Sequence, residues 1–440
     1  MASKLVVIVG AIWKEGDYMK LFPHQIEALE SVKCHQNVAF YLDMGLGKTF
    51  TASEHVDRMD PQCILLVCPK SMCSMWLNHY TTHYPHRKTF DLSKPKHLKS
   101  FLIHDGLKIG IVSYQTVWRR KELIELQDFV LVCDESSNLQ NKTAKQTKGI
   151  LRMNPKNVIL LSGTPTAGKY ENLWTQAQLL GWNISEDLYN RQYVNWKTIE
   201  SDGFFHKIVD MDNPYKNVER LKQKFRDHGA VFMKTEEVFD LPEQTFTTVT
   251  VPTSKEYKRF IRDSIVQLAD GTELIGDQIF TKRLYARQLC GMYSADKLDA
   301  FKELIQSTND RVIVFYNFTA ELMALLKICD ELGRLASVIN GSMKCLEQYE
   351  NHDDSITFIQ YQAGAMGLNL QKANKMIYFS LPERSDLFEQ SKKRIHRMGQ
   401  SRPCFYWIMQ CEDSVEEMIY QTLLERKDFT DELFKEKIQG

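Results

Sequence analysis

The sequence has no excess of charge of either sign. Its 440 residues contain 56 Lys and Arg and 56 Asp and Glu, so any contact with nucleic acid must come from a local patch rather than from a global basic field. It also lacks an apolar run long enough to span a bilayer. The apolar stretch at residues 5–13 is short, continues into charged residues and has no cleavage-site pattern after it, which indicates a strand. We therefore expect an intracellular, cytoplasmic protein without membrane contact.

Paired cysteine spacings are absent as well. The ten cysteines are scattered, and Cys63, Cys68 and Cys73 occur without a CxxC pair. This argues against the common zinc-site spacings and favours reduced thiols. The 43% hydrophobic and 25% charged content is that of a globular protein, and the length suffices for two or three domains.

A glycine-rich turn followed by Lys-Thr is the most informative stretch of the chain. It spans residues 42–49, follows an apolar run at residues 38–42 that is predicted to be a strand, and precedes a helix predicted to begin near Phe50. Strand, glycine turn and helix are the layout of a phosphate-binding loop, in which Lys48 reaches the β and γ phosphates and Thr49 holds Mg²⁺. Leu42 stands where the first glycine of GxxxxGK[ST] belongs, so the match alone could be an ordinary glycine turn.

Short apolar strands after this loop each end in polar residues. They are predicted at residues 63–68, 109–112, 129–133 and 158–161. Continuously apolar strands separated by helices indicate a parallel sheet covered on both faces, and ligands of such sheets lie at the carboxyl ends of the strands.

Two polar positions near this sheet suggest specific chemistry. Asp134 would hold Mg²⁺ and Glu135 would polarise the attacking water; solvated carboxylates are the alternative. Gln25, upstream of the loop, could read an adenine edge with its amide, or could simply face solvent at a helix start.

The second half of the chain predicts another lobe. An aromatic and charged region at about 183–232 is interpreted as a mainly helical insertion in an N-terminal lobe, residues 1–243. Residues 244–256 are predicted to link it to a C-terminal lobe, residues 257–440. That lobe has its own strand series and no phosphate loop. Its strands are predicted at residues 311–316, 336–339, 356–359, 375–379 and 405–409.

A basic segment late in the chain contains Arg394 and Arg397. On a helix, two arginines three residues apart share a face. Placed across a cleft from the γ-phosphate of ATP, they could stabilise charge in the transition state. A solvated basic helix or a contact with a phosphate backbone is the interpretation that the segment alone would favour.

Taken together, these segments resemble superfamily-two helicases, and specifically the Swi/Snf-type DNA-dependent ATPases in a compact, bacterial or phage-like form. The ending His396-Arg397-Met398-Gly399-Gln400 is particularly specific to the Swi/Snf branch. Further matching segments are 68–71 with Trp76, 161–165, 289–291, Lys297-Leu298 and 363–370. The resemblance implies an α/β fold of two tandem RecA-like lobes, with parallel sheets covered by helices.

The resemblance also implies site residues, with ATP and Mg²⁺ as cofactors. Nucleotide contacts would come from Gln25, Met44, Gly45, Leu46, Gly47, Lys48, Thr49, Asp134 and Gly367. Catalytic residues would be Lys48, Glu135, Arg394 and Arg397, with Thr49 and Asp134 as metal ligands. A DNA backbone would be held by Lys70, Ser71, Ser113, Tyr114, Asn340, Gly341 and Ser342, contacts that carry no sequence information.

Some positions depart from the family pattern. Ser137 stands where the family usually has histidine, Gln360-Tyr361 replaces a usual Ser-Thr, and Ser380–Glu383 replaces an aspartate-and-tryptophan segment. These positions bear on the coupling of ATP hydrolysis to movement. The expected function is a monomeric, ATP-dependent motor on duplex DNA. The alternatives are a strand-separating DNA or RNA helicase, and a weakly hydrolysing, ATP-gated nucleic-acid-binding module.

Overall fold

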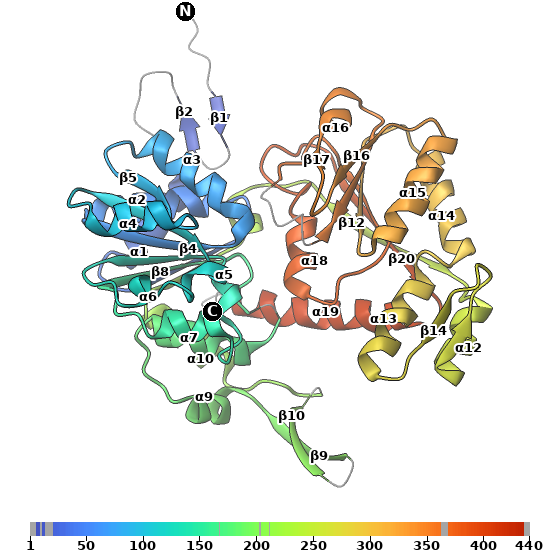
Figure 1. Cartoon of the computed structure of the whole chain (residues 1–440), viewed down its shortest axis with the longest axis horizontal. Helices are drawn as coiled ribbons and strands as arrows, with labels where there is room; N and C mark the ends of the chain where they lie inside the picture. The colour runs from blue at the N-terminus through green and yellow to red at the C-terminus, as the bar shows by residue number, and fades with distance from the viewer. Residues whose placement is uncertain are drawn as a thin grey trace, which may run out of the picture. The chain divides into compact units, whose positions relative to one another are not determined.

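Two compact units make up the protein, each built around a seven-stranded sheet (Figure 1). The computed structural model describes residues 6–8, 11–13, 21–166, 168–201, 204–210, 212–361 and 368–434. The first unit runs to Phe239 and includes the residues from Asp428 onward, and the second is Asp240–Lys427. The predicted fold class, two tandem α/β lobes with helix-covered parallel sheets, is confirmed.

The first sheet has the strand order β11-β3-β8-β7-β4-β6-β5, and its strand pairs are all parallel. Its strands are β3 (Val38–Leu42), β4 (Cys63–Cys68), β5 (Lys88–Asp91), β6 (Lys108–Ser113), β7 (Val130–Asp134), β8 (Asn157–Leu161) and β11 (Ala230–Met233). The helices are α1 (Pro23–Val32), α2 (Lys48–Met59), η1 (Lys70–Met72), α3 (Cys73–His83), α4 (Pro95–Ile103), α5 (Tyr114–Val117), α6 (Lys121–Ile124), η2 (Ser136–Leu139), α7 (Lys145–Leu151), η3 (Tyr170–Leu173), α8 (Trp174–Leu179), α9 (Glu186–Tyr193), α10 (Val218–Asp227) and α11 (Thr235–Val238).

The continuous apolar strands of this sheet follow from burial on both faces. Along β3, Ala39 and Tyr41 pack into one hydrophobic cluster, whereas Phe40 and Leu42 pack into another. Successive side chains of a strand point to opposite faces, so a strand buried on both sides needs an apolar residue at every position. The sequence therefore predicted β3 and β4 with the bounds that the structure has.

The second sheet has the order β12-β20-β19-β15-β18-β16-β17, and within the described part of the unit only the β16–β17 pair is antiparallel. Its strands are β12 (Gln244–Val251), β15 (Val312–Tyr316), β16 (Ala336–Ile339), β17 (Lys344–Cys345), β18 (Ile356–Gln360), β19 (Lys375–Tyr378) and β20 (Cys404–Cys411). The helices are α12 (Lys255–Asp263), α13 (Ile279–Cys290), α14 (Ala295–Gln306), α15 (Thr319–Glu331), α16 (Glu347–Asn351), α18 (Ser385–Lys392) and α19 (Val415–Phe434).

Among the described residues, three short antiparallel strand pairs lie outside the two main sheets. They are β1 (Val6–Ile8) with β2 (Ala11–Trp13), β9 (Trp196–Ser201) with β10 (Phe204–Val209), and β13 (Ile265–Gln267) with β14 (Glu273–Ile275). The first of these occupies the N-terminal stretch for which a strand was predicted.

The prediction of a linker at residues 244–256 is wrong for most of that range. Residues 244–251 form strand β12, which pairs in parallel with β20 along its whole length. β12 is an edge strand with mostly exposed side chains, so no apolar run marks it. Its threonines nevertheless suit a strand, because β-branched residues favour extended backbone.

The predicted mainly helical insertion is also corrected. Between the two helices α9 and α10 lies the β9–β10 hairpin, which projects from the first unit (Figure 1). The last residues of the expected insertion belong to β11, which pairs with β3 in the main sheet. The hairpin was missed because its side chains are largely exposed, as at Phe205, so no buried apolar pattern reveals it.

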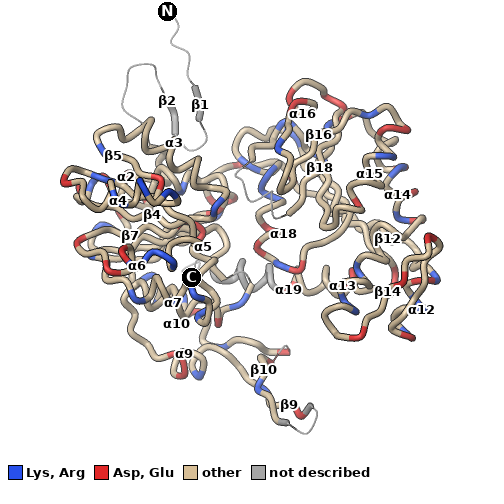
Figure 2. Tube along the Cα trace, in the orientation of Figure 1, with Lys and Arg blue, Asp and Glu red and all other residues tan. Residues whose placement is uncertain are grey.

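Charges of both signs are interspersed over each unit (Figure 2), in keeping with the balanced totals of acidic and basic residues. Within the described residues, no helix is both long and apolar enough to cross a membrane.

Candidate nucleotide-binding site

The glycine-rich turn connects β3 to α2. Gly45 and Gly47 have φ values of 94° and 73°, in the left-handed region that glycine enters without steric cost. Leu42 is the last residue of β3 and is buried. The missing glycine of the motif therefore falls on the strand end, and the turn itself does not need it.

Lys48 lies at the first position of α2, two residues before the predicted helix start. Its Nζ donates to the carbonyl oxygens of Leu42 (2.8 Å) and Asp43 (3.1 Å), so the ammonium group folds back over the turn. A Cβ on Gly163 would lie 3.4 Å from this Nζ. The glycine therefore lets the loop after β8 approach the lysine closely.

Helix α1 holds the turn on one side. The Gln25 side chain is fully buried, and its Nε2 donates to the carbonyls of Leu46 (3.5 Å) and Gly47 (3.3 Å), while its Oε1 accepts from the Phe22 N–H (2.8 Å). The His24 Nε2 lies 3.0 Å from the Leu46 oxygen, and burial lowers the pKa of this histidine. Gln25 is thus no solvent-facing residue; its contact with adenine stays a prediction.

Helix α11 holds the turn on the other side. The Oδ2 of Asp43 accepts a hydrogen bond from the Thr235 hydroxyl (3.0 Å), and its Oδ1 accepts from the Met44 N–H (2.9 Å). Thr235 is buried. It was missed in the sequence because 192 residues separate it from Asp43.

The Asp134 carboxylate at the end of β7 is held by a tryptophan. The Trp76 Nε1 donates to Asp134 Oδ2 at 2.7 Å, and the Tyr114 hydroxyl donates to the Asp134 carbonyl at 2.9 Å. Burial raises the pKa of Asp134 to about 6; the Trp76 hydrogen bond and the Lys48 charge lower it, and the Glu135 charge raises it further. A cation near this carboxylate would favour its ionised form.

Glu135 follows with a φ of 54°, a left-handed conformation that is uncommon for a residue with a side chain. Its Oε1 accepts hydrogen bonds from the hydroxyls of Ser137 and Ser162, both at 2.8 Å. Ser137, at the position where the family usually has histidine, is therefore bonded to the predicted base. Ser162 connects the loop after β8 to the same carboxylate.

The donor set suits Mg²⁺. Asp134 offers a carboxylate and Thr49 a hydroxyl, the hard oxygen ligands that Mg²⁺ prefers. The carboxylate is partly buried and its pKa is raised, so a divalent cation would relieve the cost of its charge. The predicted metal ligands are thus chemically compatible with the ion, and their role stays a prediction.

Two residues predicted to contact DNA on the first unit have buried side chains, so any contact with DNA would have to come from their backbone. Tyr114 is fully buried and Ser113 is 4% exposed, with its hydroxyl bonded to the Thr116 hydroxyl at 3.0 Å. Both pack inward at the end of β6, where an apolar strand meets the sheet core. Lys70 is exposed on η1 and Ser71 is partly exposed, so these two remain accessible.

The predicted DNA-contacting loop of the second unit is exposed. The Oδ1 of Asn340 accepts the N–H groups of Ser342 (2.9 Å) and Met343 (2.7 Å). This side chain therefore shapes the turn after β16 and presents Gly341 and Ser342 to solvent.

The prediction that one helix carries both Arg394 and Arg397 is wrong. α18 ends at Lys392, and Arg394 and Arg397 lie in the turns after it. The two side chains are 2% and 6% exposed, and burial lowers the pKa of Arg397. The Nη1 of Arg397 donates to the Leu368 carbonyl at 3.4 Å. Gly367, predicted to contact nucleotide, lies outside the described residues.

Other residues of this motif stabilise the turn itself. The Gln400 Nε2 lies within hydrogen-bond distance of the carbonyls of Gln371 (3.1 Å), Ala373 (2.8 Å) and Ile395 (3.2 Å). The His396 Nε2 lies 2.9 Å from the Pro242 oxygen. Through these contacts, His396 and Gln400 have a structural role.

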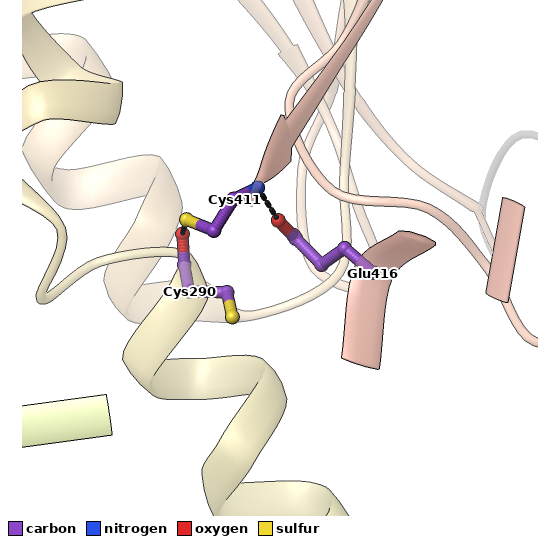
Figure 3. Close-up of side chains that lie close together, drawn as sticks. All are labelled: Cys290, Cys411 and Glu416. Atoms are coloured by element: carbon purple, nitrogen blue, oxygen red, sulfur yellow. Dashed lines mark hydrogen bonds between the residues drawn. The ribbon is translucent and has the colours of Figure 1, made fainter. Parts of the chain in front are cut away.

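A buried cluster in the second unit brings Cys290, Cys411 and Glu416 together, with ligand atoms within 4.8 Å of one another (Figure 3). Both oxygens of Glu416 accept from Lys297 Nζ, at 2.6 and 2.7 Å, and its Oε2 also accepts from the Cys411 N–H at 3.0 Å. The carboxylate is thus neutralised by a lysine of the same unit, and we interpret the cluster as structural.

Comparison with known proteins places these motifs in a family context. A model described as SNF2-related domain matches residues 24–294, and one described as Helicase conserved C-terminal domain matches residues 296–399. The chain is 23% identical to Bacillus subtilis YwqA, whose name gives it as an ATP-dependent helicase/translocase, over 89% of this chain and 46% of that protein. It is 23% identical to the ISWI chromatin-remodeling complex ATPase ISW1 of Saccharomyces cerevisiae, over 91% of this chain and 39% of that protein.

The chain therefore spans less than half the length of these two relatives. Among solved structures, the Sulfolobus solfataricus SWI2/SNF2 ATPase core in complex with double-stranded DNA matches with a TM-score of 0.46 and 19% identity, covering 97% of this chain and 94% of that chain.

Proposed function

The chain belongs to the SNF2-related family of helicase-type ATPases, and from this premise we propose that it is a DNA-dependent ATPase that moves along duplex DNA. ATP and Mg²⁺ are the proposed cofactors. The proposed partner is DNA, with the protein acting as a monomer.

One observation carries the proposal: three strands that are neighbours in the first sheet lead to polar groups that lie close together at one end of the sheet. β3, β8 and β7 are neighbours and lead to Lys48, Ser162 and Glu135 respectively. Ser162 bonds to Glu135, and the following Gly163 approaches Lys48. Ligands of parallel sheets bind at such carboxyl ends, and these groups are those needed to hold a phosphate chain and activate a water.

The proposed chemistry divides the work among these residues. Lys48 and the N–H groups of the turn and of the α2 N-terminus bind the β and γ phosphates. Glu135 accepts the proton of the attacking water, with its Oε1 fixed by two serine hydroxyls. Mg²⁺, held by Thr49 and Asp134, neutralises phosphate charge. Arg394 and Arg397 of the second unit stabilise the charge that develops in the transition state.

Movement requires contacts with DNA from both units. The accessible residues are Lys70 and Ser71 in the first unit and the Asn340–Ser342 turn in the second. These side chains and backbone groups suit phosphate oxygens rather than base edges. Because the chain has no net charge, we expect modest affinity that falls steeply with added salt.

The deciding experiment measures the ATPase rate with no nucleic acid, single-stranded DNA, duplex DNA and RNA. We expect duplex DNA to stimulate most, a triplex-displacement assay to report movement, and a forked duplex to remain closed. Lys48→Ala serves as the inactive control. Stronger stimulation by RNA or single strands would overturn the duplex assignment.

A strand-separating helicase is the second candidate, favoured by the β9–β10 hairpin. Trp196 and Phe205 on this hairpin are 41% and 76% exposed, and exposed aromatic rings can stack on unpaired bases. If the hairpin separates strands, the parent opens forks and Phe205→Ser loses this activity, while the control Ile103→Ser, at another exposed apolar side chain, keeps it.

A further inference from the structure

Two buried side chains converge on Asp134 from segments that follow β4, the neighbour of β7, and β6, the strand beyond β4. Trp76 comes from α3, which follows β4, and Tyr114 comes from the end of β6. Both are fully buried, and they donate to the Asp134 carboxylate at 2.7 Å and to its carbonyl at 2.9 Å. The residue proposed to bind the metal is thus held through both its side chain and its backbone.

The tryptophan has little freedom to turn away from this contact. Its ring stacks on Tyr80 with centroids 6.0 Å apart and meets His79 edge to face at 5.6 Å. An indole N–H can only donate, so the bond fixes which carboxylate oxygen faces α3. The rotation of the Asp134 carboxylate is therefore set by the packing of α3.

We propose that Trp76 is a positioning residue whose indole N–H orients the Asp134 carboxylate toward the Mg²⁺ of bound nucleotide. The inference rests on the proposed function, because it requires Asp134 to be a metal ligand. Partners that orient a ligating carboxylate through a hydrogen bond typically affect metal affinity or activity by about 10-fold to 100-fold.

The same contact connects the proposed metal site to the segment that is proposed to contact DNA. α3 begins directly after η1, which carries Lys70 and Ser71, and Trp76 lies in the first turn of α3. A shift of η1 on binding a phosphate backbone would move the indole and with it the carboxylate. Trp76 is therefore a physical link between DNA contact and Mg²⁺ coordination.

The test removes the N–H while keeping an aromatic ring. In Trp76→Phe, the Mg²⁺ concentration for half-maximal Mg²⁺-dependent binding of a fluorescent ATP analogue should rise by about tenfold or more. Binding of the analogue without Mg²⁺ should not change. The matched control is Trp174→Phe, which removes an indole hydrogen bond to the Ile184 carbonyl (3.0 Å) away from the site and should leave the Mg²⁺ dependence as in the parent.

A second variant guards against a packing effect of the smaller ring. Trp76 is replaced by 3-benzothienylalanine, in which sulfur takes the place of the N–H in a bicyclic ring of similar size. The same rise in Mg²⁺ requirement, with weaker stimulation of the ATPase by duplex DNA, supports the inference. A Mg²⁺ requirement equal to the parent's overturns it, and the proposed function then still stands if the parent is stimulated by DNA. If the parent itself binds nucleotide without any Mg²⁺ dependence, both fail.

Discussion

The two units contain similar sheets but use their polar groups differently. In the first, Lys48, Asp134 and Glu135 lie at the carboxyl ends of strands, around a turn shaped by glycines with positive φ. In the second, Lys297 and Glu416 form a buried ion pair with an N–O distance of 2.6 Å, and Gln400 satisfies backbone carbonyls. The polar residues named in the first unit are those proposed to bind a ligand, whereas the ones named in the second stabilise its own fold.

This difference shows that family motifs need not all be catalytic. Outside the motifs, the buried carboxylate of Glu321 has a similar structural role in the second unit, since its Oε2 accepts the N–H groups of Asn317 and Phe318, both at 3.0 Å, at the start of α15. Two residues depart from this contrast. Arg397 in the second unit is proposed to act in catalysis, and the buried His79 in the first unit has a structural role. Four predictions probe these roles.

Substitution of Arg397 has the largest expected effect, and it tests whether a polar residue of the second unit acts in catalysis. If it completes the active site, Arg397→Ala lowers kcat by about 10³-fold, as for other arginine fingers, while binding of nucleotide to the first unit changes little. Steady-state ATPase and nucleotide titration measure the two. The exposed Arg259→Ala is the control. Unchanged turnover with lowered stability would place Arg397 among the structural residues of its unit.

Glu135 tests the ligand-directed role of the first unit. Glu135→Gln should reduce hydrolysis by about 10²-fold to 10⁴-fold, since only the proton acceptor is lost. Affinity for ATP with Mg²⁺ should stay near that of the parent in equilibrium titration. Hydrolysis at the parent rate would show that another group is the base.

Lys297 tests the structural role of polar groups in the second unit. Lys297→Ala leaves the buried Glu416 carboxylate uncompensated and should destabilise by about 3–5 kcal/mol in urea unfolding. The control Lys302→Ala removes an exposed lysine of the same helix, paired with Glu331, and should cost about 0–1 kcal/mol. The double variant Lys297→Met with Glu416→Leu should recover most of the lost stability. If Lys297→Ala were as stable as the control Lys302→Ala, the structural role of Lys297 would be refuted.

His79 gives the smallest effect, in the first unit. Burial, with a smaller contribution from His83, lowers the pKa of His79 to about 3, below the value of about 6.5 in the unfolded chain. The unfolded state therefore takes up a proton first as the pH falls below 6.5, and stability decreases by at most about 1.4 kcal/mol per pH unit. Urea unfolding between pH 7 and 5 should show a shallower decrease for His79→Gln, but not for the exposed His352→Gln.

Local patterns allowed much of the first unit to be predicted. β3, β4, the glycine turn and the Asp134–Glu135 strand end were predictable because continuous apolar runs and glycines act through neighbouring residues. The edge strand β12 was not, since an edge strand with exposed side chains carries no apolar run. The residues of β11 were assigned to the helical insertion, although they are apolar and mostly buried.

The sequence by itself determined which residue types stand at the strand ends, and hence the two α/β units and the glycine-rich turn before α2. Only the tertiary structure decided which side chains face those ends. It turned Tyr114 inward, placed Arg397 after a helix instead of on it, and brought Trp76 to Asp134 across 58 residues of chain. Such pairings depend on how helices pack on the sheet, and packing joins residues whose separation in sequence carries no signal.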